Sequence, residues 1–536
     1  MSKLFLQPKN KWEFRQKGDS NLYFRGDLSE LVIEKLLDSS ITKKKLSQIP
    51  IKIYENFLFI LSNKNFHAIV SDRIRSYAIC FSSKNKVWHI GDHISELSQS
   101  LKPLKINNSS LLSFSMSGYV LGNNTLYKNI FSIEASQIIF LDDHGKFQSL
   151  SYCKHYYLNT LDYSYEELQR TLEEKILHIF SRLVKKCGNR QIVVPLSAGY
   201  DSRLVVSTLH KLGYKNVKCY SYGFYGDFES STSKKIAKKL GYDWKFIPMN
   251  SLRELIFYRS KEFKSYLNFA DNIVSTPVLR WLSTIKYLKE SGWIDKDAIF
   301  VNGNSGDFIS GGHLPEEIIS NSQFDQNASL ERVISLTIEK HFSLWNKLKN
   351  CDNLSLIRAD IKKEIQKKFS DSNFKNESRI FESLEFYNRQ SKYVINTQRI
   401  YEFYGFDWYL PLWDKEFINF WERVPEKYKL GQKLYKETLR GLNYGDVWKI
   451  PLNKPNIRPY WIILPRFLAK ISFRFLPNGR EKWKKFDKIF FQYWMDNGMV
   501  TKAHSYFDYI KLKDRKNILS ITSRNYLKAK IYNNDY

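Results

Sequence analysis

The residues best suited to chemistry lie together in the segment SAGYDS, at 197–202. An apolar run, IVVPL, precedes this segment, and a helical pattern follows from about Arg203. A loop between a buried strand and a helix directs free backbone N–H groups and the positive end of the helix dipole toward one point. Ser197 and Ser202 add hydroxyl donors, and Gly199 lets the backbone approach a ligand closely. The segment therefore predicts a phosphate site, with a plain strand-to-helix turn as the alternative.

Asp201 in this loop indicates a metal ion. A carboxylate beside a phosphate repels it unless a cation lies between them, and Mg²⁺ is commonly held by one or two carboxylates together with substrate phosphates. The loop is not a P-loop, because it lacks both the GxxxxGK[ST] spacing and a lysine. We therefore expect Mg²⁺ on Asp201.

The chain around this loop alternates between apolar runs and helical patterns. A β-α-β-α-β order is typical of a parallel, doubly wound sheet, and a glycine follows each of the two crossover helices. Most of 325–445 is predicted to be helical. The expected elements are a helix at 163–187, a strand at 191–197, a helix at 204–213, a strand at 217–223, a helix at 231–241 and strands at 244–249 and 298–303.

Residues 1–155 are rich in short β-type runs separated by Asn, Lys and Ser turns. Runs at hairpin spacing predict stacked antiparallel sheets. We expect strands at 51–61, 66–72, 76–82 and 86–92, a loop at 118–130 and a hairpin at 136–147.

Four segments of the chain resemble the asparagine synthetase family, which includes the β-lactam and carbapenam synthetases. LSAGYDSRLV (196–205) looks like the family's SGGxDS pyrophosphate loop, and residues 221–244 are similar to its second strand and helix. NGNSGDFISGGH (302–313) resembles the SGEGxDExxGGY loop, and 410–440 resembles the PFLD…LP…K…K..LR stretch. The matching positions in these last two segments are Gly303, Asp307, Gly311, Gly312, Pro411, Asp414, Pro425, Lys433, Leu439 and Arg440.

The resemblance implies an α/β chain of three parts. A glutamine amidotransferase-like β-sandwich of the Ntn type would occupy 1–158. A Rossmann-like PP-loop domain that binds adenine nucleotide would occupy 159–450. A basic, aromatic-rich helical extension would occupy 451–536.

The resemblance also implies a reaction. A carboxylate would attack ATP to give an acyl-adenylate and pyrophosphate, and an amine, expected to be ammonia, would displace AMP. Mg²⁺ would bind Asp201 and Asp307, and the catalytic residues would be Asp201 and Lys433. The residues expected to bind ATP or pyrophosphate are Leu196, Ser197, Ala198, Gly199, Tyr200, Asp201, Ser202, Tyr222, Gly223, Gly303 and Asn304.

The chain departs from the family in both halves. Glutamine-using members have a cysteine after the initiator Met, whereas Ser2 follows Met1 here and the nearest cysteine is Cys80. A freed serine could act as a nucleophile, but the Cys-Gly-Ile context and an RGPD stretch are absent, so we expect an inactive glutaminase domain. Asn304 and Phe308 take the family's two acidic positions in SGEGxDE. This places aspartate as substrate in doubt.

These departures leave the substrate open. We expect a carboxylate other than aspartate, such as a uronic acid sugar in bacterial surface-polysaccharide synthesis. The alternatives are asparagine synthesis from aspartate and a non-catalytic nucleotide-binding scaffold. His313, where the family often has tyrosine, either lines the pocket or is structural.

The charge of the chain favours anionic partners. Its 536 residues carry 84 Lys and Arg against 55 Asp and Glu, a net charge of +29. Such a charge suits phosphates or anionic surfaces, although coding bias is an alternative explanation. No zinc motif or RNA-binding module is evident, so a nucleic-acid partner is not expected.

The last 86 residues carry 18 Lys and Arg against 6 acidic residues. Within 458–477, Arg466, Lys470 and Arg474 recur every four residues among aromatic and aliphatic side chains. On a helix this forms a basic stripe beside an apolar face. The segment is either a helix packed on the domain or one that lies on an anionic membrane surface.

The remaining features predict a cytoplasmic protein, with a peripheral position at the inner face of the membrane as the alternative. The five cysteines are widely spaced and contain no CxxC pair, which argues against disulfides and structural zinc. No signal peptide and no run of 18 apolar residues is present.

Overall fold

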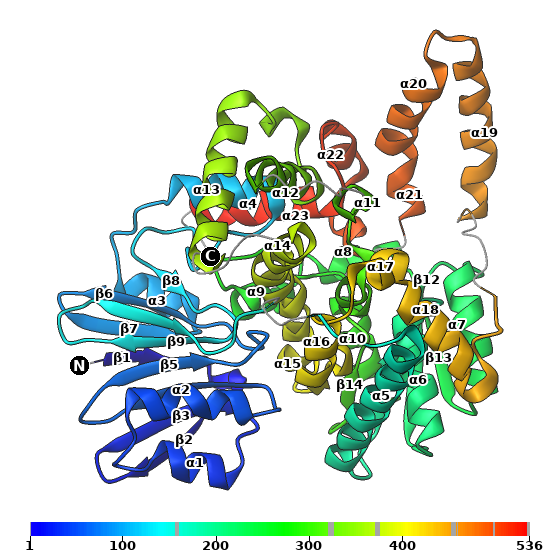
Figure 1. Cartoon of the computed structure of the whole chain (residues 1–536). Helices are drawn as coiled ribbons and strands as arrows, with labels where there is room; N and C mark the ends of the chain where they lie inside the picture. The colour runs from blue at the N-terminus through cyan, green and yellow to red at the C-terminus, as the bar shows by residue number, and fades with distance from the viewer. Residues whose placement is uncertain are drawn as a thin grey trace.

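A computed structural model describes residues 2–155, 160–319, 326–369, 376–451, 457, 459–496 and 499–532. The N-terminal strands lie on one side of the molecule, and a parallel sheet with its helices lies on the other (Figure 1). The chain is therefore a mixed α/β protein, as expected. The boundary predicted at 158 falls outside the described residues.

Two β-sheets pack face to face in the N-terminal part. One has the order β10-β9-β5-β4-β3-β2 and is antiparallel throughout, and the other has the order β1-β7-β6-β8. Ile60 and Ile69 of the first sheet share a core with Phe81 and Trp88 of the second, so the sheets are stacked as predicted. The strands are β1 (Ser2–Phe5), β2 (Glu13–Lys17), β3 (Ser20–Gly26), β4 (Phe57–Ser62), β5 (His67–Ser71), β6 (Cys80–Lys84), β7 (Val87–Gly91), β8 (Phe131–Ser132), β9 (Gln137–Leu141) and β10 (Phe147–Ser151).

The strand expected at 51–61 is wrong in its first half. The helix α2 (Lys43–Lys52) occupies its start, because Leu46 joins the core beneath the six-stranded sheet and Pro50 is buried beside it. The strand β4 begins only at Phe57.

The other strands expected in the N-terminal part agree more closely with the structure. The run at 76–82 is paired only from Cys80 onward, because Arg75 adopts a φ of 59° and turns the chain before the strand. The expected segments 66–72, 86–92 and 136–147 are confirmed as β5, β7 and the β9–β10 hairpin.

A five-stranded parallel sheet forms the centre of the second part. Its order is β13-β12-β11-β14-β15, and each pair of neighbours is parallel. This confirms the predicted β-α-β-α-β pattern. The last strand was not expected, because its three residues lie in a segment that is otherwise helical. The strands are β11 (Ile192–Pro195), β12 (Val217–Gly223), β13 (Asp243–Pro248), β14 (Ile299–Val301) and β15 (Asp407–Tyr409).

Helices cover both faces of this sheet (Figure 1). The first, α5 (Tyr165–Cys187), begins with a capping box in which Ser164 and Glu167 satisfy each other's backbone N–H groups. The two crossover helices, α6 (Tyr200–Lys211) and α7 (Phe228–Lys239), each begin three to four residues before the predicted start. The later helices are α12 (Gln326–His341), α13 (Cys351–Phe369), α14 (Glu377–Leu384), α15 (Arg399–Phe403), α16 (Lys415–Trp421), α17 (Glu426–Lys429) and α18 (Lys433–Leu442).

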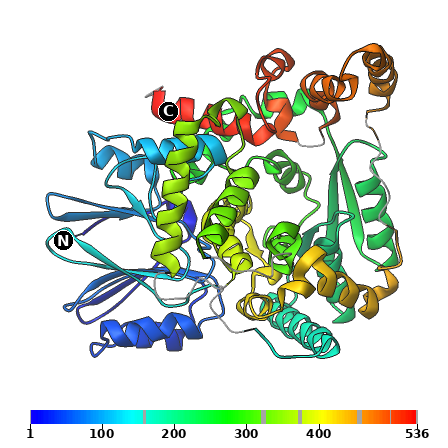
Figure 2. The same ribbon diagram turned by 45° about the horizontal axis from the view of Figure 1, so that its top comes forward.

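The C-terminal extension returns to the N-terminal part. The helix α23 (Ile518–Leu527) packs on α4 (Asn108–Ser117), where the rings of Tyr526 and Phe114 stack at 5.3 Å (Figures 1 and 2). Before it, α19 (Ile463–Ser472) and α20 (Gly479–Phe486) form a hairpin that projects from the body of the molecule (Figure 1). In the described part of the chain, none of the helices combines the length and apolarity needed to cross a bilayer.

Candidate active site

The loop after β11 closes on itself through its two serines. The Ser202 hydroxyl accepts from the backbone N–H of Ser197 at 3.0 Å, and the two hydroxyl oxygens are also 3.0 Å apart. The Ser197 hydroxyl accepts from the N–H of Gly199 at 3.2 Å. These bonds draw residues 200–202 into the first turn of α6, which explains the early start of this helix. The N-terminus of α6 thus lies beside the loop, where its dipole favours an anion.

Asp201 and Asp307 meet at the carboxyl ends of β11 and β14. The backbone N–H of Asp307 donates to Asp201 Oδ2 at 3.2 Å, and the Tyr435 hydroxyl donates to Asp201 Oδ1 at 2.8 Å. Two glycines permit this approach. A Cβ on Gly303 would lie 2.7 Å from the backbone of Asp201, and one on Gly306 would lie 2.6 Å from its carboxylate. The loop at 302–313 therefore packs directly against the Asp201 turn.

The pairing of these two carboxylates has an electrostatic cost. Burial, and then the negative charge of Asp307, raise the pKa of Asp201 to about 7. A bound cation would relieve this repulsion. Within the described ranges there is no cluster of three or more His, Cys, Asp or Glu side chains arranged for a metal. The two carboxylates are oxygen donors of the kind that Mg²⁺ prefers.

A cleft of about 420 Å³ opens above this pair. Of the predicted ligand-binding residues, the cleft is lined by Leu196, Ser197, Asp201, Ser202, Tyr222, Gly303, Asn304 and Asp307. The predicted residues outside its lining are Ala198, Gly199, Tyr200, Gly223 and Lys433. The structure thus brings together residues from three separate sequence segments.

Lys433 lies apart from the cleft. It is exposed at the start of α18, and its Nζ lies 5.4 Å from the centre of the Tyr165 ring. Its catalytic role stays a prediction. The residue of α18 that contacts the carboxylate pair is Tyr435, two positions further on.

Among the cleft residues that were missed from the sequence, three bring a charged group or an indole ring. Arg280 and Trp281 lie just before α10 (Leu282–Glu290), and Glu229 lies in the first turn of α7. The Trp281 indole donates to the Tyr222 hydroxyl, which fixes two aromatic walls of the cleft. No local motif marks these residues, since they meet only when the sheet assembles.

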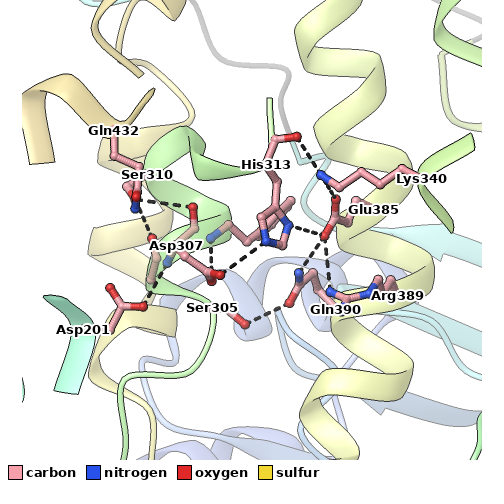
Figure 3. A network of polar contacts seen from close by, with 12 residues as sticks. Asp201, Ser305, Asp307, Ser310, His313, Lys340, Glu385, Arg389, Gln390 and Gln432 are labelled. Atoms are coloured by element: carbon pink, nitrogen blue, oxygen red, sulfur yellow. Dashed lines mark hydrogen bonds and ion pairs between the residues drawn. The ribbon is translucent and has the colours of Figure 1, made fainter. Parts of the chain in front are cut away.

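An ionic network centred on the buried Glu385 contacts Asp307 on the side away from Asp201 (Figure 3). His313 Nε2 lies 3.3 Å from Asp307 Oδ2, and its Nδ1 lies 2.6 Å from Glu385 Oε1. Although burial opposes the charged form, Asp307 and Glu385 raise the pKa of His313 to about 9. A protonated His313 therefore holds Asp307 in place. It is outside the cleft lining, so it is a supporting residue here.

Glu385 is the hub of this network. Its carboxylate also contacts His341 Nε2 at 3.1 Å, Lys340 Nζ at 3.2 Å and the Gln390 side-chain amide at 2.9 Å. Burial alone would raise the pKa of Glu385, but the charges and hydrogen bonds of His341 and His313 hold it well below its usual range. An ionised Glu385 thus orders the cations beside the cleft.

The positions at which the chain departs from the family's motifs differ in their burial and contacts. Asn304 lines the cleft, whereas Phe308 is buried at the start of the next turn and contacts the ring of His313 edge-on. Ser2 is paired with Trp88 at the start of β1 and is partly buried. Its role as a nucleophile stays a prediction.

Comparison with known proteins agrees with this geometry. Residues 184–445 match the asparagine synthase family, and this span holds β11 to β15 and every predicted site residue of the nucleotide domain. A protein of Acanthamoeba polyphaga mimivirus, named a probable asparagine synthetase (glutamine-hydrolyzing), is 27% identical over 189 residues. The alignment covers 33% of this chain and 32% of the viral protein, so the chain spans about a third of that relative's length. Residues 184–445, just under half of the chain, therefore form a domain of the asparagine synthase family.

Proposed function

We propose that this protein is an ATP-dependent amide-forming ligase. The observation that carries the proposal is the meeting of Asp201 and Asp307 beside the serine-closed loop at the N-terminus of α6. This arrangement unites a cation site with an anion site, which is what a magnesium-bound triphosphate requires. The family match over 184–445 supports the same reaction class.

In this proposal the chain's own groups position ATP for attack on its α-phosphate. The backbone N–H groups at the N-terminus of α6 and the hydroxyls of Ser197 and Ser202 would hold the pyrophosphate, and Asp201 and Asp307 would hold Mg²⁺. When bound, the ion would neutralise part of the negative charge of the phosphates. The end of β12 at Tyr222 and Gly223 would receive adenine.

A carboxylate must be activated before it can acylate an amine, because oxide is a poor leaving group. Transfer of AMP to the carboxylate gives an acyl-adenylate and releases pyrophosphate. An amine then displaces AMP and forms the amide. We propose ammonia as the amine, since Ser2 stands where glutamine-using members have cysteine. Two positively charged side chains are candidates to act near the phosphates. Arg280 lines the cleft, whereas Lys433 lies outside it and would have to approach.

The acceptor is proposed to be a sugar carboxylate, such as a uronic acid of bacterial surface polysaccharide. The reason is that Asn304 is neutral where the family has an acidic residue, and it lines the cleft. An amide side chain can hydrogen-bond a hydroxyl or a carboxylate but does not attract an ammonium group as a carboxylate does. Aspartate, which carries an ammonium group, is the alternative substrate.

A second candidate function is a nucleotide-binding scaffold. The loss of both acidic positions in the 302–313 loop favours it. The retention of the Asp201–Asp307 pair, with glycines that admit their contact, favours the enzyme.

The test is pyrophosphate release from ATP and Mg²⁺ with a panel of carboxylates. The panel contains aspartate, glutamate and nucleotide-linked uronic acids, each with ammonia or with glutamine. We expect release with one uronic acid and ammonia, and its loss in Asp201→Asn. Asp143→Asn, in the exposed β9–β10 turn, is the matched control. ATP binding without release for any acid would favour the scaffold, and release with aspartate would favour asparagine synthesis.

A further inference from the structure

The helical hairpin formed by residues 460–495 stands out from the rest of the molecule (Figure 1). Its two arms are α19, and α20 with α21 (Gln492–Met495). Arg466 joins the arms by donating twice to Asp487, at 2.6 and 2.8 Å. The rings of Phe473, Trp483 and Phe486 pack between the arms at centre distances of 5.1 to 6.2 Å. The hairpin is therefore held together by its own side chains.

The outer face of α19 is apolar, and the described part of the chain leaves it uncovered. None of the ten residues of α19 is buried. Its large apolar side chains continue into the flanking turns as one stripe at helical spacing. The exposed members of this stripe are Ile463, Leu464, Phe467, Leu468, Phe475 and Leu476.

This exposure is unusual for a helix in water. Amphipathic helices normally turn their apolar side toward a core. A contiguous exposed apolar stripe marks an interaction surface. Phe475, at the turn between the arms, is 84% exposed and is the most exposed large apolar side chain in the described part of the chain. Since no described segment of the chain covers the stripe, we expect a binding partner to cover it.

Positive charge surrounds the stripe. Residues 460–495 contain eight Lys and Arg against two acidic residues, a net charge of +6. Lys470 and Arg474 are exposed on the same arm, and Arg480, Lys482 and Lys484 are exposed on the other. An apolar stripe bordered by cations is complementary to an anionic lipid surface, whose headgroups attract the cations while the acyl region accepts the aromatic and aliphatic side chains.

We propose that the helical hairpin at 460–495 binds the surface of an anionic phospholipid bilayer, with the exposed face of α19 inserted among the headgroups. The ten residues of α19 measure about 15 Å at the rise of an α-helix. This length suits a helix lying in the plane of the interface. A nucleic acid would satisfy the cations but would leave the aliphatic side chains of the stripe in water. The membrane proposal stands independently of the proposed reaction.

The test is sedimentation of the full chain with vesicles. We expect binding to vesicles of equal parts phosphatidylcholine and phosphatidylglycerol, weaker binding at high salt, and little binding to phosphatidylcholine alone. Leu468→Glu should lower partitioning roughly tenfold or more. Removing one positive charge should lower vesicle partitioning roughly fivefold. The double variant Lys470→Gln/Arg474→Gln should therefore lower it by more than about tenfold.

Matched controls lie on α13. Leu356 is 55% exposed and Leu468 is 56% exposed, so Leu356→Glu makes the same change on an equally exposed helix position. Lys362→Gln with Lys363→Gln removes two exposed charges from that helix. Both controls should bind vesicles as the unaltered chain does, and thermal melting should show all variants folded.

Several outcomes would overturn the proposal. These are no vesicle binding, equal binding to neutral and anionic vesicles, and hairpin variants that bind no less than the α13 controls. A further one is hairpin-dependent binding of an oligonucleotide without any binding of vesicles.

Discussion

Asp201 Oδ2 accepts a hydrogen bond from the backbone N–H of Asp307 at 3.2 Å, although 106 residues separate the two in sequence. The contact joins the turn after β11 to the loop after β14, at the edge of the sheet where ligands bind in open α/β folds. Two carboxylates at one edge, beside the N-terminus of a helix, form the basis of the proposed magnesium–triphosphate site.

Gly303 is required for this contact. A Cβ at position 303 would lie 2.7 Å from the Asp201 backbone, so Gly303→Ala must displace one of the two loops. We expect a loss of stability of about 1–3 kcal/mol and a larger loss of pyrophosphate release. Gly441→Ala in α18 is the control, since a Cβ there meets nothing within 4 Å. Equal activity in both variants would contradict the predicted role of Gly303.

Tyr435 stabilises the ionised form of Asp201 through its 2.8 Å hydrogen bond. Tyr435→Phe should therefore raise the pKa of Asp201 and weaken Mg²⁺ binding. A hydrogen bond worth about 0.5–1.5 kcal/mol corresponds to a roughly two- to tenfold higher Mg²⁺ requirement. Titration of pyrophosphate release with Mg²⁺ measures the effect. Tyr444→Phe removes a comparable bond to Glu173 and should leave the titration unchanged.

Glu385 is the buried counter-charge of two partly buried cations. In Glu385→Gln the side chains of His313 and Lys340 lose this counter-charge, and His341 loses a charged hydrogen-bond partner. Breaking a buried ion pair from one side costs about 3–5 kcal/mol, which thermal melting would detect. Glu331→Gln removes an exposed carboxylate that lies 3.1 Å from Arg358, and such a surface pair is worth at most about 1 kcal/mol. Similar melting temperatures for the two variants would contradict the role of Glu385.

His504 links stability to pH. Burial lowers the pKa of His504 to about 4, below the usual value of 6.5. Between pH 4 and 6.5 the unfolded chain binds a proton at His504 more readily than the folded chain does. The free energy of unfolding is therefore highest above pH 6.5 and falls as the pH drops toward 4. His504→Gln should lessen this fall by about 3 kcal/mol, measured as melting temperature against pH. His144→Gln, in an exposed turn, should not change the curve.

Sequence predicted the parts of the fold that local pattern controls. The strands at 217–223 and 244–249 and the serine loop follow from apolar runs and turn residues that are contiguous in the chain. The strand β15 was missed because three residues carry too little alternation to distinguish them from the helices around them.

The candidate site shows the same division. Asp201 and Asp307 lie in motifs, so sequence indicated both. Arg280 and Trp281 enter the cleft only through the packing of α10 beside the sheet, and no spacing marks them. Glu385 reaches His313 across 72 residues, a relationship that a single sequence does not contain. The exposure of the α19 stripe likewise depends on which face the rest of the chain leaves uncovered.

The most direct measurement of the central claim is exchange of labelled pyrophosphate into ATP in the absence of any amine. Reversible formation of an acyl-adenylate predicts exchange that requires Mg²⁺ and one particular carboxylate, and that is lost in Asp201→Asn while Asp143→Asn retains it. If the chain binds ATP yet shows no carboxylate-dependent exchange with any acid of the panel, the adenylating role of the Asp201–Asp307 pair is contradicted.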